Sequence, residues 1–223
     1  QEGIAAHWKY KEGKAGVDAM DKELEWVRVH YCYPEELDDK LIQTIKEEDK
    51  ICKYLDLPIQ HASNDILKRM GRRTSKEQLI EIVGKLREEI PDIALRTTLI
   101  TGFPGESEED HEILMDFVDE MEFDRLGVFT YSPEEDTPAA TMPAQIEEDV
   151  KEDRQAELME LQQEIAFEAA ENMTGEVLTA MIEGKIAEDD IYVDLDQAEK
   201  YLSLVKYFPF ERLFPWEEFV LIL

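Results

Sequence analysis

Short apolar runs alternate with charged amphipathic stretches through the middle of the chain. Four runs rich in β-branched and aromatic residues have the spacing of strands. They are Trp26–Tyr31, Tyr54–Gln60, Ala94–Thr101 and Arg125–Ser132. Between and beside them, apolar residues recur every three or four positions, as they do on one face of a helix. These helical stretches are Glu35–Lys50, Asn64–Met70, Ser75–Glu89 and Ser107–Met121.

The order of these elements predicts an α/β fold. Strands that are separated by helices cannot form hairpins, so they pair in parallel through crossover connections. We therefore expect a partial (βα) barrel or an open parallel sheet. Four strands are too few to close a barrel, which usually needs about six to eight. Either further strands lie elsewhere or the sheet has an open edge.

Beyond the last of these strands the pattern changes. Ala144–Asn172 reads as one long acidic helix, and Glu176–Lys185 alternates like a strand. The apolar positions of the long helix are Val150, Leu158, Leu161, Ile165 and Phe167. The two ends of the chain differ from its middle in composition. We predict a distinct segment 1–25, an α/β domain 26–173, the start of a small β module 174–193 and an aromatic tail 194–223.

Charge and cysteine content narrow the function classes. The formal net charge of −30 argues against broad contact with nucleic acid and fits a solvated surface or a basic protein partner. No apolar run is long enough for a membrane span, so we expect a cytoplasmic protein. Cys32 and Cys52 have no metal-binding spacing, and even with His30 they make no complete metal site. We expect both to be buried structural cysteines.

Polar residues follow the ends of the predicted strands, where parallel α/β sheets bind ligands. The sharpest segment is Arg96–Glu106, with Gly102-Phe103-Pro104-Gly105 between strand and helix. Its glycines allow close approach to a ligand, and free amides at the helix start favour anionic or polar groups. The same four residues are equally typical of a simple turn.

Three other segments are candidates of the same kind. Gln60 and His61 follow a strand and could contact a sugar or adenine, although His61 is also typical of a satisfied buried histidine. Arg72 belongs to the basic cluster Lys68–Arg73, which could pair with a carboxylate or be a solvated turn. Tyr131–Pro138 could be a binding loop or an ordinary acidic loop.

Six runs, in matching order and spacing, resemble the radical-SAM methylthiotransferase family. They are VHYCYPEEL, YLDLPIQHAS, ILKRMGRR, LRTTLITGFPGE, FDRLGVFTYSPEEDTPAA and EVLTAMIEGKI. The chain is most similar to the branch that modifies an aspartate of a small-subunit ribosomal protein. The tRNA-modifying branch is the alternative; it usually has a different residue after Thr97, where this chain has Thr98.

The resemblance implies S-adenosylmethionine and 4Fe-4S clusters as cofactors and a small-subunit ribosomal protein as partner. It implies a partial cosubstrate pocket formed by Gln60, His61, Arg72, Arg96, Thr98, Gly102 and Glu106. It places Tyr131, Ser132 and Glu134 at the substrate mouth. The family's C-x-x-x-C-x-x-C motif is not found here, so we assign no catalytic residue and no metal ligand, and we expect a fragment that is inactive alone. A non-catalytic acidic module that docks a basic protein is the rival interpretation.

The two ends resemble other proteins. Glu2–Lys14 is similar to a segment of the (p)ppGpp synthetase/hydrolase family, and Phe208–Leu223 faintly resembles the start of a phage terminase large subunit. A truncated or joined reading frame and a deliberate chimera would both explain this composition.

Overall fold

The computed structural model describes residues 27–174 and the backbone of 177–180, 184–186, 191–193 and 219–222. The chain divides into two compact units, residues 1–162 and 163–223. The predicted segment 1–25 and most of the predicted tail 194–223 lie outside the described residues. All the candidate site residues belong to the first unit.

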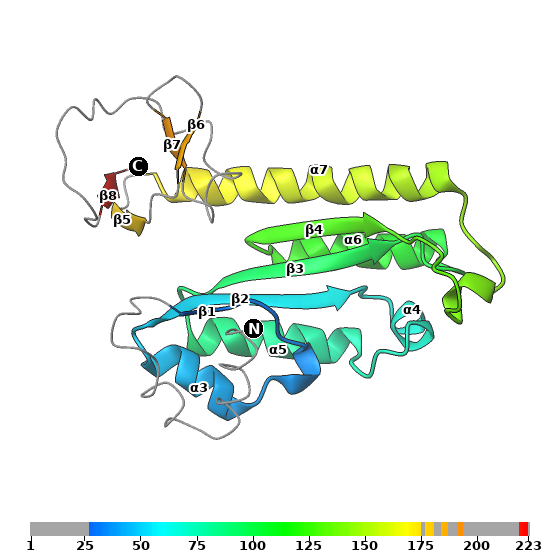
Figure 1. Cartoon of the computed structure of the whole chain (residues 1–223), viewed down its shortest axis with the longest axis horizontal. Coiled ribbons are helices and arrows are strands. Elements are labelled where there is room, and N and C mark those ends of the chain that lie inside the picture. Colours follow the sequence, from blue (N-terminus) through cyan, green and yellow to red (C-terminus); the bar gives the residue numbers. More distant parts are fainter. Residues whose placement is uncertain (1–26, 175–176, 181–183, 187–190, 194–218, 223) are drawn as a thin grey trace. The chain divides into compact units, whose positions relative to one another are not determined.

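The first unit is built on a parallel sheet of four strands in the order β1-β2-β3-β4 (Figure 1). The strands are β1 (Val27–Val29), β2 (Ile51–Gln60), β3 (Ala94–Thr101) and β4 (Arg125–Thr130). The predicted α/β class and parallel pairing are confirmed. Strand β3 has the predicted bounds, whereas β2 begins three residues earlier than its apolar pattern indicated.

The connecting segments are helical, as expected from their apolar spacing. The helices are η1 (Pro34–Glu36), α3 (Asp39–Glu47), α4 (Asn64–Arg69), α5 (Lys76–Glu89), α6 (Glu108–Met121), η2 (Ala139–Thr141) and α7 (Glu148–Asn172). The single helix predicted over 35–50 is two elements, because Leu37 and Asp38 adopt extended backbone and the Asp38 carboxylate caps α3. Capping boxes begin α5 at Ser75 and α6 at Ser107.

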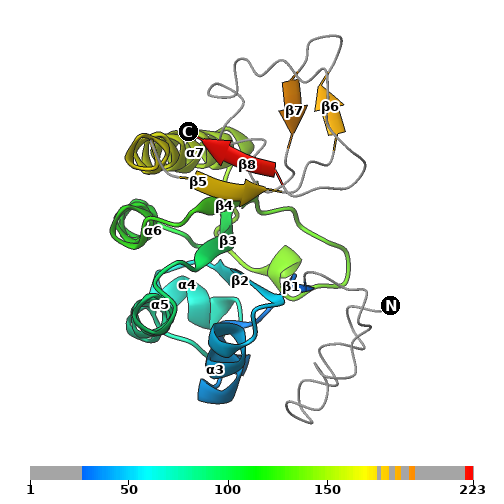
Figure 2. The same ribbon diagram turned by 90° about the vertical axis from the view of Figure 1, so that its left-hand side faces the viewer.

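The two faces of the sheet have different environments. In β3, Leu95, Thr97, Leu99 and Thr101 are buried, and the residues between them are only partly buried. Figure 2 shows α5 and α6 end-on along one side of the sheet. The buried side chains of β3 therefore face these helices, and its partly buried side chains point to the opposite side of the sheet. That side, called the open face below, carries Arg96, Thr98, Ile100, Gly127 and Phe129.

The second unit contains two short antiparallel pairs. One joins β5 (Val177–Ala180) to β8 (Phe219–Ile222), and the other joins β6 (Gly184–Ile186) to β7 (Ile191–Val193). The strand predicted over 176–185 thus contains β5 and the start of β6. None of the helices in the described part of the chain has both the length and the apolar character required to cross a membrane.

Candidate functional site

A cavity of about 540 Å³ lies where the carboxyl ends of β2, β3 and β4 meet the loops that follow them. Three of the predicted site residues line it: Gln60 at the end of β2, and Tyr131 and Ser132 after β4. Gln60 has a positive φ of 75°, at the irregularity where the β2–β3 register shifts. The remaining wall is mostly apolar and includes Met70, Ile100, Phe103, Phe129 and Met142.

Two further predicted residues, Arg96 and Thr98, lie together on the open face. Arg96 Nη1 is 2.7 Å from Asp56 Oδ2 and donates to Thr98 Oγ1 at 3.1 Å. Gly127 leaves room for this guanidinium, because a Cβ there would be 3.3 Å from Arg96 Nη2. Asp56 is buried, and its other oxygen, Oδ1, has no hydrogen-bond partner among the described residues. The ion pair therefore fixes the guanidinium and leaves one buried acceptor free.

Arg72 and Glu134 do not line this cavity. Arg72 Nη2 is 3.2 Å from Glu35 Oε2, and its guanidinium lies 4.9 Å from the centre of the Tyr33 ring. Arg72 thus connects the loop after α4 to the segment that follows β1. Glu134 is exposed, and its carbonyl accepts a hydrogen bond from Thr137 Oγ1 at 2.8 Å. The structure therefore distributes the predicted residues over several contacts and gathers only Gln60, Tyr131 and Ser132 in this cavity.

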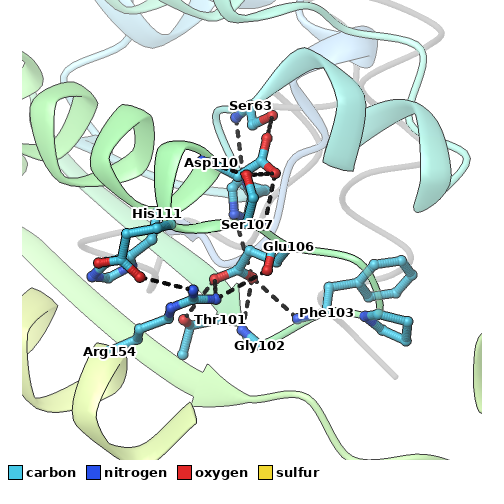
Figure 3. A network of polar contacts seen from close by, with 12 residues as sticks. Ser63, Thr101, Gly102, Phe103, Glu106, Ser107, Asp110, His111 and Arg154 are labelled. Carbon is cyan, nitrogen blue, oxygen red and sulfur yellow. Dashed lines mark hydrogen bonds and ion pairs between the residues drawn. The ribbon is translucent and has the colours of Figure 1, made fainter. Parts of the chain in front are cut away.

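Glu106 is the centre of a buried polar network next to the loops at the carboxyl ends of the strands, which are called the rim below (Figure 3). Its carboxylate accepts hydrogen bonds from the amides of Gly102 at 2.7 Å and Phe103 at 3.1 Å, and from Thr101 Oγ1 at 3.3 Å. The Gly105 amide donates to the Ala144 carbonyl. The chain's own acceptors therefore occupy the amides of Gly102, Phe103 and Gly105 in the loop, whereas the expectation of free amides at the start of α6 stays a prediction.

Two cations or potential cations face the Glu106 carboxylate. Arg154 Nη1 is 3.0 Å from Oε1, and His61 Nε2 is 3.6 Å from Oε2. His61 Nδ1 accepts the Ser63 amide, so the neutral imidazole carries its proton on Nε2, toward Glu106. Burial alone would raise the pKa of Glu106. The neighbouring imidazole, the Phe103 amide and the guanidinium outweigh it and hold the pKa below its usual range.

Sequence reasoning missed Asp56, Lys151 and Arg154. Asp56 lies inside an apolar strand, and the strand pattern assigns it no role. Lys151 and Arg154 are buried, although they belong to a helix that reads as a solvated acidic stretch. One signal was available: they are the only basic residues in α7, three positions apart and hence on one face.

The described residues offer no set of ligands for an iron–sulfur cluster. No three His, Cys, Asp or Glu side chains come together there in a way that could hold a metal ion. Cys32 and Cys52 form no disulfide; Cys32 is buried as expected, whereas Cys52 is only partly buried. Burial, together with the charges of Glu36 and Asp38, raises the pKa of Cys32 to about 11, so this side chain is a thiol at neutral pH.

Comparison with known proteins identifies the relatives of the chain. The model of the radical SAM superfamily matches residues 7–118. The ribosomal protein uS12 methylthiotransferase RimO of Lachnoclostridium phytofermentans is 67% identical over 170 residues, which are 76% of this chain and 39% of that protein. RimO of Geobacter sulfurreducens is 54% identical over 168 residues, or 75% of this chain and 38% of that protein. The chain therefore spans about two fifths of the length of these relatives.

Among solved structures, coproporphyrinogen III oxidase (HemN) from Escherichia coli, a radical SAM enzyme, matches with a TM-score of 0.46 and 20% identity. The match covers 64% of this chain and 31% of that structure.

Proposed function

Since the chain belongs to the radical SAM superfamily, we propose that it forms the cosubstrate- and substrate-facing part of a methylthiotransferase whose target is an aspartate of ribosomal protein uS12. The observation that carries this proposal is the high identity to RimO proteins over about three quarters of the chain. The cavity at the carboxyl ends of the strands is of ordinary size for a small-molecule site.

The rim and the open face fit S-adenosylmethionine chemically. The cavity supplies apolar walls for a flat base, and Gln60 and Ser132 supply amide and hydroxyl groups. Two buried polar atoms have no hydrogen-bond partner among the described residues: the hydroxyl of Tyr131 and Oδ1 of Asp56. Arg96 presents a fixed guanidinium suited to a carboxylate. We assign Gln60, Arg96 and Thr98 to cosubstrate binding, and Tyr131, Ser132 and Glu134 to the substrate mouth.

The roles of the remaining predicted residues are less direct. Glu106 and His61 have side chains that are 0% exposed, so they shape the Gly102–Gly105 loop from beneath rather than contact a ligand from the cavity. Arg72 orders the neighbouring loop through Glu35 and Tyr33.

An iron–sulfur cluster, when bound, supplies the electron that cleaves the cosubstrate in this family. The described residues do not fit such a cluster. This chain's contribution is therefore to bind and orient the cosubstrate and to exclude water around it, and methylthio transfer needs cluster ligands that these residues do not supply. We expect no methylthio transfer by the chain alone.

A direct test is isothermal titration of the chain with S-adenosylmethionine. We expect saturable binding that weakens about tenfold or more in Arg96→Ala, because a charge-assisted contact is lost. Lys85→Ala is the matched control, since Lys85 is also an ion-paired cation but lies exposed on α5. Absence of saturable heat, or equal affinity in Arg96→Ala and the unaltered chain, would refute the proposal.

The acidic docking module remains a separate candidate because of the net charge of −30. It predicts salt-sensitive binding of purified uS12 without any affinity for S-adenosylmethionine. Binding of both, with uS12 binding strengthened by the cosubstrate, would favour the methylthiotransferase part instead.

A further inference from the structure

The first half of α7 packs against the sheet unit through an unusual set of residues. Four of its side chains within 148–162 are buried: Lys151, Arg154, Leu158 and Gln162. They share one face of the helix. Only Leu158 is apolar, so this face is held mainly by polar contacts rather than by a hydrophobic stripe.

Each polar contact from this face reaches a defined acceptor. Gln162 Nε2 donates to the Phe123 carbonyl at 2.8 Å, before β4, and Gln155 Nε2 donates to the Val128 carbonyl at 2.6 Å, within β4. Lys151 Nζ donates to the Tyr131 carbonyl at 2.9 Å, just after β4. The contacts therefore follow β4 from its start to the rim of the candidate site.

Arg154 joins this face to the glycine loop. Its Nη1 donates to Glu106 Oε1 at 3.0 Å and to the Glu106 carbonyl at 3.3 Å, and Nη2 donates to Glu108 Oε2 at 3.1 Å (Figure 3). Glu106 in turn holds the amides of Gly102 and Phe103. The guanidinium thus compensates the buried carboxylate that fixes the loop.

Lys151 holds the same loop from beside it. A Cβ at Gly102 would lie 2.2 Å from Lys151 Cγ, so the aliphatic part of the lysine fills the space that the glycine leaves. Gly102 also has a positive φ of 74°, which favours glycine. The lysine Nζ, bonded to the Tyr131 carbonyl, fixes the turn that lines the cavity, where the Tyr131 and Phe103 rings meet edge-on.

We propose that Arg154 and Lys151 are positioning residues: together they form a clamp on α7 that sets the conformation of the Gly102–Gly105 loop and of the Tyr131 turn, and thereby the shape of the ligand cavity. The identity of the ligand rests on the proposed function. The effect of the clamp on the loop conformation does not depend on any ligand. Phe103 and Tyr131 both line the cavity, so a shift of either turn changes its walls.

The first measurement needs no ligand. Amide hydrogen exchange of the unaltered chain is compared with that of Arg154→Lys, which keeps the charge but loses the two-pronged contact with Glu106 and Glu108. We expect exchange at the Gly102 and Phe103 amides to accelerate about tenfold or more, because their acceptor loses its partner. Lys151→Met keeps the aliphatic stem and should accelerate exchange mainly after β4.

Gln162→Ala is the matched control. It removes another polar contact of the same helix face, but one that ends at Phe123, before β4 and outside the cavity lining. We expect it to lower the midpoint of denaturant unfolding while leaving exchange in the glycine loop unchanged. Loop exchange that accelerates equally in Gln162→Ala and Arg154→Lys would overturn the clamp and leave only a general role in stability.

The second measurement is the affinity for S-adenosylmethionine by titration. Arg154→Lys should weaken binding about tenfold, as expected for a small misplacement of contacting groups, whereas Gln162→Ala should bind normally. Equal affinities of Arg154→Lys and the unaltered chain would refute the effect on the cavity. If the unaltered chain binds no S-adenosylmethionine, the proposed function fails, and the exchange comparison still decides whether the clamp exists.

Discussion

At the scale of single residues, the buried charges of this chain are stabilised by specific partners rather than by solvent. Glu106 has a fully buried side chain, yet its pKa lies below its usual range because imidazole, amide and guanidinium groups surround it. Sequence patterns identified Glu106 by its place at a helix start. They could not identify Arg154, because the partner lies 48 positions away and only the tertiary fold brings the two together.

Glu106 makes the stability of the fold depend on acid pH. Its folded-state pKa is depressed, so its contribution is present above the ordinary value of 4.5 and is lost as the pH falls through the lower folded value. We expect Glu106→Gln to flatten the pH dependence of the unfolding free energy below 4.5. Denaturant titrations between neutral and acid pH measure this. Glu109→Gln, which alters an exposed carboxyl in the first turn of α6 three positions further on, is the control and should keep the slope of the unaltered chain.

At the scale of helices and strands, the local sequence pattern was sufficient to predict an element where buried and partly buried residues alternate regularly. The bounds of β3 follow directly from ALRTTLIT, in which every second residue is buried. Helix α7 was also predicted, but its apolar positions do not mark the face it buries: Leu158 is buried, whereas Val150 is 37% exposed and Phe167 is 54% exposed. Polar side chains attach this helix, and a hydrophobic pattern carries no information about hydrogen bonds to distant carbonyls.

Two phenylalanines on opposite sides of the sheet test the assignment of its faces. Phe117 of α6 is fully buried, whereas Phe129 of β4 is 59% exposed on the open face. We expect Phe117→Ala to lower the free energy of unfolding by about 3–5 kcal/mol, and Phe129→Ala by about 1 kcal/mol or less. Equilibrium denaturation of both variants measures the difference. Similar losses for the two would mean that the open face is covered in solution.

At the scale of the whole molecule, the alternation of strands and helices was enough to predict a parallel sheet, because crossover connections leave few other arrangements. The clustering of Gln60, Tyr131 and Ser132 around one cavity follows from the same rule, because parallel strands end at one edge of the sheet, whereas the order of the strands was not predicted. The separation of Arg72 from this cavity did not, since it depends on contacts with Glu35 and Tyr33 that no local pattern encodes.

The large negative charge is a property of the entire chain and has its own consequence. With 54 acidic and 24 basic residues, self-repulsion opposes compactness. We expect the unfolding midpoint at pH 7 to rise as sodium chloride is increased from about 0.01 to 0.3 M, since screening lengths shorten from about 30 Å to less than 10 Å. Thermal melts at several salt concentrations measure this. A midpoint that falls instead would show that exposed ion pairs, such as Lys85–Asp39, outweigh the repulsion.

The polar contacts that hold α7 also determine which measurement would detect its detachment from the sheet. Within 148–162, Leu158 is the one buried apolar side chain that such a detachment would expose, together with the stems of Lys151 and Arg154. Both the heat-capacity increment and the denaturant slope scale with newly exposed surface, so this helix contributes to either quantity less than a helix with a hydrophobic stripe would. Limited proteolysis at the junction before α7 would therefore report its detachment more directly than calorimetry.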